Sequence, residues 1–180
     1  MVFYFTCTTD PDTTIYMGRD KNENEFLIKY AQHHDVWFHV DGLSSAHVYL
    51  RTKEPITSYE QIKPETILEC AQLTKANSIE GCKKASVAMN YTWATNLLKT
   101  EDMQTGSVSY KNNKLVVKFN IEKNKDQIRQ TLKTKREENP DFQKDYNDYR
   151  MKLERKENAE KKQHKIKLEE EEKQAKDQLN

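Results

Sequence analysis

The sequence predicts an α+β fold, with a mixed β-sheet and two packed helices followed by a long charged C-terminal α-helix. Three observations support this fold class. Short β-prone runs with alternating side chains recur through the first 120 residues. Two segments between these runs carry apolar residues at helical spacing. From about residue 124 onward the chain is mostly Lys, Arg, Glu, Asp, Gln and Asn, a composition that favours a solvated helix.

The first predicted elements are a hairpin and a short helix. Residues 2–7 and 13–17 are rich in strand formers and flank a Thr-Thr-Asp-Pro-Asp turn. Gly18 then breaks the strand, and Asp20 is suited to cap a helix because its carboxylate can accept from free backbone N–H groups. Phe26 and the apolar residues after it recur at helical spacing, which predicts an amphipathic helix.

Residues 35–40 and 46–51 form the next two predicted strands, joined by an Asp-Gly-Leu-Ser-Ser loop. Successive side chains of a strand point to opposite faces. The face with Val36, Phe38 and Val48 is therefore apolar. The opposite face carries aromatic, imidazole and guanidinium groups, from Trp37, His39, His47, Tyr49 and Arg51.

A second helix is predicted to begin at Pro64, which is tolerated in a first turn, and to end near Gly81. Small residues on one stripe of this helix predict close packing on the sheet. Further strands are expected at residues 86–91, 106–110 and 114–120. Lys111-Asn-Asn113 has the composition of a hairpin turn between the last two of them.

The chain divides into three predicted parts. Residues 1–120 form the globular domain, residues 121–139 a connecting helical segment, and residues 140–180 a charged helical or coiled-coil-like tail. Pro140 separates the last two because it disfavours helix in the residue before it. The tail carries a short heptad-like stripe that we expect to bind a partner, formed by Phe142, Tyr146, Tyr149 and Leu153. Whether the tail dimerises is left open by the sequence.

Composition limits the class of protein. With 180 residues, 35% of them hydrophobic, the chain can build one modest core. The 30 basic and 29 acidic residues nearly cancel, so any nucleic-acid surface must be a local patch. Three cysteines without paired spacing predict a reduced intracellular protein, in the cytoplasm or alternatively the nucleus. No run approaches the roughly 18 apolar residues of a membrane span, and the first residues do not resemble a signal peptide.

Several stretches of this sequence form a recognisable set. They are Asp35-Val-Trp-Phe-His39, Ser44-Ser-Ala-His-Val-Tyr-Leu-Arg51, Lys75-Ala-Asn-Ser78, and Asn90-Tyr-Thr92 followed by Asn96-Leu-Leu-Lys99. Together they resemble the NFACT-R (NFACT RNA-binding) domain over roughly residues 1–120. The opening Met-Val-Phe-Tyr-Phe-Thr, the Ile15-Tyr-Met-Gly18 strand end and the charged tail are similar to the coiled-coil domain-containing protein 25 family, a stand-alone form of that domain.

This resemblance implies an RNA-binding domain, which in the larger NFACT proteins acts on stalled large ribosomal subunits in quality control. The domain itself implies nucleic-acid binding, with rRNA or tRNA contact as an extension of it, and the choice between RNA and DNA stays open. One departure from the family pattern concerns the third motif, which often reads Tyr-Thr-Pro-Trp and ends in Lys-Lys. Here Tyr91-Thr-Trp-Ala94 lacks the proline and Leu98 precedes a single Lys99, which predicts a weaker basic contact.

The residues and the resemblance together predict a nucleic-acid-binding site of aromatic rings, histidines and cations. Its members are Trp37, His39, Ser45, His47, Tyr49, Arg51, Lys75, Asn77, Lys83, Lys84, Tyr91, Asn96 and Lys99. In an alternative interpretation, Trp37 and Tyr49 pack beneath a helix, the histidines bond internally, and the lysines belong to ordinary solvated surface. Replacing His47 and Arg51 is expected to weaken binding without unfolding the protein.

An enzyme is not predicted. Ser44, Ser45, two histidines and two aspartates supply the side-chain types of a catalytic triad, but no G-x-S-x-G elbow accompanies them. The histidines and cysteines show no zinc spacing, and the four glycines are too far apart for a phosphate-binding loop, so no metal or cofactor is expected. The sequence therefore favours a non-catalytic RNA-binding adaptor, associated with ribosomes or tRNA. The alternative is a protein-interaction scaffold that uses its C-terminal helix and does not bind nucleic acid directly.

Overall fold

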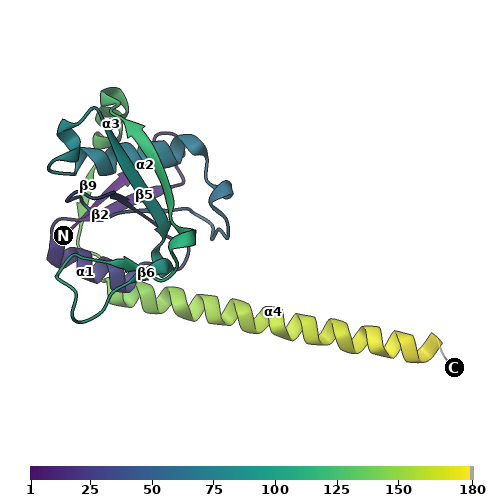
Figure 1. The fold of residues 1–180 in the computed structure, drawn as a ribbon. Helices are drawn as coiled ribbons and strands as arrows, with labels where there is room; N and C mark the ends of the chain where they lie inside the picture. Colours follow the sequence, from purple (N-terminus) through teal and green to yellow (C-terminus); the bar gives the residue numbers. More distant parts are fainter. Residues whose placement is uncertain (179–180) are drawn as a thin grey trace. The chain divides into compact units, whose positions relative to one another are not determined.

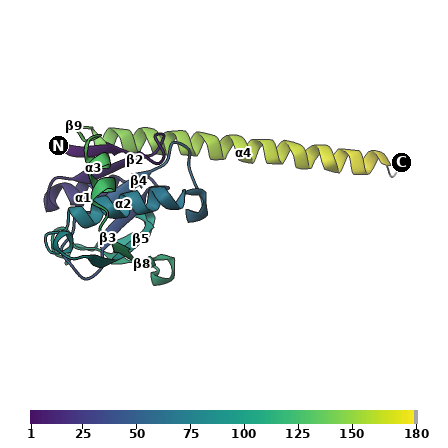
Figure 2. The same ribbon diagram turned by 90° about the horizontal axis from the view of Figure 1, so that it is seen from above.

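The computed structural model describes residues 1–178, and the chain splits into two compact units. The first is Met1–Phe142, and the second begins at Gln143 and consists of the greater part of one helix. The α+β class predicted from the sequence is confirmed. Figure 1 and Figure 2 show the elements of the first unit from two directions.

The first unit is built on an antiparallel sheet of seven strands in the order β8-β5-β3-β4-β2-β1-β9. The strands are β1 (Val2–Thr6), β2 (Thr14–Gly18), β3 (Val36–Val40), β4 (Val48–Arg51), β5 (Ser86–Trp93), β8 (Val117–Glu122) and β9 (Arg136–Glu138). A second sheet pairs β6 (Leu97–Leu98) with β7 (Ser109–Tyr110). The predicted N-terminal hairpin is confirmed as the antiparallel pair of β1 and β2.

Four α-helices and four short turns accompany these strands in residues 1–178. They are α1 (Lys21–Tyr30), α2 (Pro64–Ala76), α3 (Lys125–Leu132) and α4 (Phe142–Gln178), with short 3₁₀ turns η1 (Tyr59–Gln61), η2 (Gly81–Lys83), η3 (Ala94–Asn96) and η4 (Asn113–Leu115). The Asp20 carboxylate accepts from the backbone N–H groups of Asn22 and Glu23, as its position before α1 predicted. Pro64 occupies the first turn of α2.

The predicted alternation of β3 and β4 places the core on two faces of the sheet. The apolar face, with Phe38 and Leu50 at its centre, packs under α2, and α3 lies beside α2 (Figure 1). The opposite face carries Tyr16, Trp37 and Tyr49, all almost fully buried. It is covered by α1 and the β6–β7 segment, so both faces of this sheet are enclosed rather than one facing water.

One predicted hairpin is wrong. Residues 106–120 do not pair with each other, because β7 pairs with β6 and β8 pairs with β5. The Asn112 side chain accepts from the Lys114 N–H and starts the turn η4, which redirects the chain between the two sheets. Strand β8 then lies beside β5, where Val117, Phe119 and Ile121 contribute to the core. Long-range burial therefore overrides the local turn signal.

The segment at 121–139 is only partly helical. Helix α3 occupies its middle, but Ile121 belongs to β8, and β9 pairs with β1 at the sheet edge. The carboxylate of Glu69 in α2 accepts from the Thr131 hydroxyl of α3 at 2.6 Å, so this segment is tied to the first unit.

Helix α4 runs from Phe142 to Gln178, and the last two residues of the predicted tail, 179–180, lie outside the described part of the chain. Several i,i+4 ion pairs run along it, among them Lys156–Glu160 and Lys165–Glu169. No helix within residues 1–178 has both the length and the hydropathy of a membrane span. Phe142 packs against the cluster around Trp37, so this first member of the predicted stripe contacts its own domain.

Candidate nucleic-acid interface

The structure divides the predicted site residues between the two sides of the seven-stranded sheet. Strand register and burial place one group on the face that α1 covers: Trp37, His39, Ser45, His47, Tyr49, Arg51, Asn96 and Lys99. The others lie on or beside the opposite face: Lys75, Asn77, Lys83, Lys84 and Tyr91. The loop at residues 41–47 joins the two sides. Ser78 Oγ, just after α2, donates to Ser44 O at 2.6 Å, and Ala46 N donates to Asn77 O.

Four members of the first group, Trp37, His39, Ser45 and His47, line a cavity of about 510 Å³ beside this loop, which we call the histidine pocket. Its size falls in the range of small-ligand sites. The pocket is formed by β3, β5, the 41–47 loop and the segment around Gly106. The polar and aromatic residues that line it are Lys21, Asn24, Trp37, His39, Asp41, Ser44, Ser45, His47, Asn90, Thr105, Ser107 and Tyr110.

Two histidines and one tryptophan form the rear of the histidine pocket. Trp37 Nε1 donates to His47 Nδ1 at 3.0 Å, and the His39 ring stacks on the Trp37 ring with centroids 5.3 Å apart and planes 13° apart. Trp37 and His47 are buried, whereas His39 is half-buried. Of these three rings, His39 is therefore the most exposed.

The histidines of the pocket are neutral at physiological pH. Burial, together with the neighbouring His39, lowers the pKa of His47 to about 4. Burial also lowers the pKa of His39, although a hydrogen bond to the Val40 carbonyl opposes it. Neutral imidazoles offer a stacking face and hydrogen bonds but no charge. The pocket therefore suits a nucleobase better than a phosphate.

Asn90 adds an acceptor that sequence reasoning did not single out. Its Nδ2 donates to Asp41 Oδ1 at 2.9 Å, while its Oδ1 is buried without a hydrogen-bond partner. A buried acceptor without a partner is costly, and an N–H donor from a ligand would satisfy it. In the sequence, the only signal for this residue is its place as the first position of the Asn90-Tyr-Thr92 motif. Its importance depends on the pairing of Asn90 with His39 across β5 and β3.

Arg51 is held inside the fold. Its Nε and Nη2 donate to the two carboxylate oxygens of the fully buried Asp35 at 2.8 and 2.7 Å. The Tyr16 hydroxyl also donates to Asp35, at 2.6 Å. Tyr49 stacks on Tyr16 and is fully buried. We therefore revise the expectation that Arg51 can be replaced without unfolding, because its loss leaves a buried charge unpaired.

Asn96 and Lys99 organise the segment that covers the pocket. Asn96 Nδ2 donates to Thr92 Oγ1 and to the Asn112 carbonyl, and it is buried. Lys99 Nζ contacts Glu25 Oε1 at 2.8 Å and donates to the carbonyls of Gln104 and Ser107. These bonds hold the loop at residues 99–108 against α1. Lys99 thus has several intramolecular partners in this structure.

On the opposite side, three of the five predicted residues are engaged within the protein. Lys75 is fully buried and donates to the carbonyls of Gly81 and Lys84. Asn77 Nδ2 donates to Leu73 O at the end of α2. Tyr91 stacks on Phe38 in the apolar core. The other two members, Lys83 and Lys84, are exposed.

Neither a catalytic triad nor a metal site is formed by the candidate residues. The Ser45 hydroxyl donates to Ala46 O and accepts from Val40 N, so it is oriented by the backbone rather than by a histidine. Asp35 is committed to Arg51. Within residues 1–178, no group of three or more His, Cys, Asp or Glu side chains is arranged to hold a metal ion.

Comparisons with known proteins bear on this interface. Residues 1–112 match the model of a family described as NFACT protein RNA binding domain, and this range contains every residue of the histidine pocket. Coiled-coil domain-containing protein 25 of Danio rerio is 49% identical over 144 residues, which is 79% of this chain and 69% of that protein. The Rqc2 homolog RqcH of Bacillus subtilis is 29% identical over 98 residues, or 54% of this chain and 16% of that protein.

A solved structure shares the fold. The C-terminal part of the fibronectin/fibrinogen-binding protein from Streptococcus suis has a TM-score of 0.59 at 22% identity. The match covers 71% of this chain and 47% of that chain. At this level of identity, the likeness concerns the fold alone.

Proposed function

Because the chain belongs to the NFACT RNA-binding-domain family, and within it to the coiled-coil domain-containing protein 25 family, we propose that it is a non-catalytic RNA-binding adaptor associated with ribosomes or tRNA. The observation that carries this proposal is the histidine pocket inside the matched range. The similarity to the Rqc2 homolog RqcH supports a role in translation quality control. Such a role would be cytoplasmic, with the nucleus as the alternative compartment.

In the proposed mechanism, an unpaired base enters the histidine pocket. Single-stranded RNA is commonly recognised by stacking of splayed bases on side-chain rings and by hydrogen bonds to base edges. His39 offers the ring face, and Asn90 Oδ1 offers an acceptor to an N–H group of the base. Lys21 at the pocket edge can meet an adjacent phosphate, since Lys acts as a mobile point charge.

The test of this site is a binding measurement on His39→Ala. Affinity for a short labelled single-stranded RNA would be followed by fluorescence anisotropy, and loss of one stacking ring should weaken it by about tenfold. His33→Ala is the matched control, because His33 is exposed and does not line the pocket. Equal thermal stability of the two variants would exclude unfolding as the cause. Unchanged affinity of His39→Ala would remove the histidine pocket from the proposal.

Association with ribosomes is tested separately. Cell lysate would be fractionated on a sucrose gradient with and without RNase, at low and high salt. Comigration with ribosomal particles that is lost with RNase and with salt is the expected result, because phosphate contacts weaken as salt rises. A complex that resists both treatments would favour the protein-interaction scaffold instead.

A further inference from the structure

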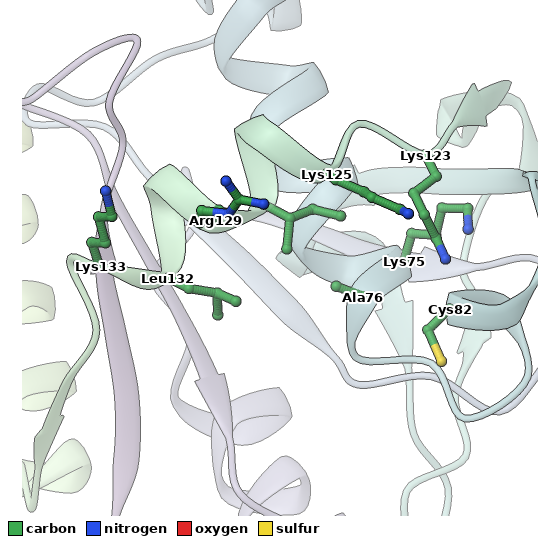
Figure 3. Close-up of a pocket in the computed structure, with 9 residues that line it drawn as sticks. Lys75, Ala76, Cys82, Lys123, Lys125, Arg129, Leu132 and Lys133 are labelled. Atoms are coloured by element: carbon green, nitrogen blue, oxygen red, sulfur yellow. The ribbon is translucent and has the colours of Figure 1, made fainter.

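A second cavity, of about 580 Å³, lies on the opposite side of the sheet from the histidine pocket, between α2, η2 and α3. We call it the basic groove. Five of its nine lining residues are cations and none is acidic; the cations are Lys75, Lys123, Lys125, Arg129 and Lys133. Figure 3 shows Lys75, Lys123 and Lys125 converging at one end of the groove, with Lys133 projecting away at the other. Ala76, Ile128 and Leu132 supply an apolar floor.

Most of the cations in this groove lack a counter-charge. Within the described residues, no carboxylate oxygen lies within 4.0 Å of the Nζ atoms of Lys123, Lys125 or Lys133. Arg129 has only a long, exposed contact with Asp126, at 3.8 Å. By contrast, Lys99, on the other side of the sheet, is paired with a carboxylate. Unpaired positive charge therefore gathers in the basic groove.

Lys75 adds a buried positive charge to the lining of the groove. It is fully buried, its Nζ donates to two backbone carbonyls, and it has no carboxylate partner among the described residues. Burial lowers the pKa of Lys75, and the nearby Lys123 lowers it further. A buried ammonium stabilised only by carbonyl dipoles favours an anion at the adjacent surface.

We propose that the basic groove binds the phosphodiester backbone of single-stranded RNA, as a second contact of the same RNA whose base occupies the histidine pocket. This proposal rests on the proposed RNA-binding function. Four exposed cations along one groove match a chain of phosphates, each of which a lysine can meet as a point charge. The groove contains no aromatic side chain, whereas protein interfaces usually include aromatic anchors among the residues that carry their binding energy.

The position of the groove supports one continuous RNA path. Lys75 and Cys82 lie at the C-terminal end of α2 and in η2, next to the hydrogen bond from Ser78 to the Ser44 carbonyl. Ser44 lines the histidine pocket on the other side of the same loop. The exposed Lys83 and Lys84 directly follow Cys82 at the end of η2. Phosphate contacts fix position and carry little sequence information, so the basic groove adds affinity rather than specificity.

The test combines charge neutralisation with salt dependence. Binding of a labelled oligouridylate would be measured over a range of salt for the wild type and for Lys123→Gln/Lys125→Gln. Each phosphate contact on a single strand contributes about 0.7 to the slope of log affinity against log salt, so the double variant should lose about 1.4 and bind about tenfold more weakly at physiological salt. Lys63→Gln/Lys114→Gln removes the same charge from exposed positions outside the groove and should change the slope little.

Cys82 provides a local readout. It is half-exposed and lines the groove, whereas Cys7 and Cys70 are buried, so a thiol reagent should modify Cys82 first in the folded protein. Oligouridylate should slow this modification several-fold in the wild type and in His39→Ala at saturating RNA, but not in Lys123→Gln/Lys125→Gln.

The outcomes separate the two proposals. The proposal for the groove would be overturned if the wild type bound RNA without slowing the modification of Cys82, and if the groove variant had the same salt slope as the wild type. The proposed RNA-binding function would still stand. Absence of any RNA binding by the wild-type chain would overturn both. Protection of Cys82 by oligoglutamate but not by RNA would show that the groove takes an acidic protein segment, and would likewise overturn this proposal.

Discussion

The hydrogen bond from Trp37 to His47 predicts that the protein loses stability in mild acid through one identifiable group. His47 Nδ1 accepts from Trp37 Nε1, so the neutral ring must carry its proton on Nε2. Protonation of Nδ1 would place two N–H groups against each other inside the core. Burial and the neighbouring His39 lower the pKa of His47 from 6.5 to about 4.

The size of the effect follows from this difference. The unfolded chain binds a proton at His47 near pH 6.5, whereas the folded chain resists it until about pH 4. The free energy of unfolding therefore falls as pH drops below 6.5, and the loss is complete below about pH 4. The total is about 3 kcal/mol, from about 1.4 kcal/mol per pH unit, and about 2 kcal/mol of it is lost between pH 7 and pH 5.

The assay is urea unfolding followed by tryptophan fluorescence between pH 7 and pH 5, on the wild type and on His47→Gln. The amide oxygen of glutamine can accept from Trp37 Nε1 but does not titrate in this range. The variant should therefore be less sensitive to acid than the wild type by about 2 kcal/mol. The same pH slope in both proteins, or an NMR titration of His47 near pH 6.5, would refute the reasoning.

Two further predictions concern buried charges. Arg51→Ala should reduce the free energy of unfolding by about 3–5 kcal/mol, because Asp35 is left charged and buried. Asp35→Asn in the same chain should recover part of this loss. Equal stability of the single and double variants in urea unfolding would contradict the prediction. Glu69→Gln should cost about 2 kcal/mol at pH 7, because the buried carboxylate accepts from backbone N–H and hydroxyl groups, including that of Thr131, and the amide cannot accept from all of them. These hydrogen bonds lower the pKa of Glu69 despite its burial. The free energy of unfolding of the wild type should therefore exceed that of Glu69→Gln at pH 7, and this difference should disappear as pH falls below about 4.5. Calorimetry across this range would contradict the reasoning if the difference did not change with pH.

Local patterns predicted much of the sheet. The alternation in residues 35–40 and 46–51 assigned Trp37 and His39 to one face and Phe38 to the other, and the register confirms that assignment. This works because a strand has a side-chain period of two, whatever its neighbours are. The Asp20 cap was predictable for the same reason, since the bonds that start α1 involve residues only two and three positions away.

The candidate site was less predictable, because function depends on exposure. A motif containing Trp37, Tyr49 and Arg51 suggests a binding face, but α1 and the β6–β7 segment cover most of it. The exposure of a side chain depends on which distant segment packs on its face of the sheet. The alternation along a strand assigns the face but does not predict whether that face is covered. Lys123 and Lys125 are residues for which the sequence suggested no site but the structure shows one. Composition placed them in a region that is charged throughout, whereas the packing of α3 beside α2 places them in the basic groove.

The sequence by itself determined the family, the α+β class, the main strands with their two faces, and the charged helical composition of the tail. Each of these depends on short-range periodicity or on local motifs. Only the tertiary structure decided that Arg51 is paired with a buried carboxylate, that Lys75 is buried, that Asn90 presents an acceptor without a partner, and that unpaired lysines meet between α2 and α3. Burial and charge pairing arise from contacts between residues far apart in the chain, and the pattern of one segment does not contain them.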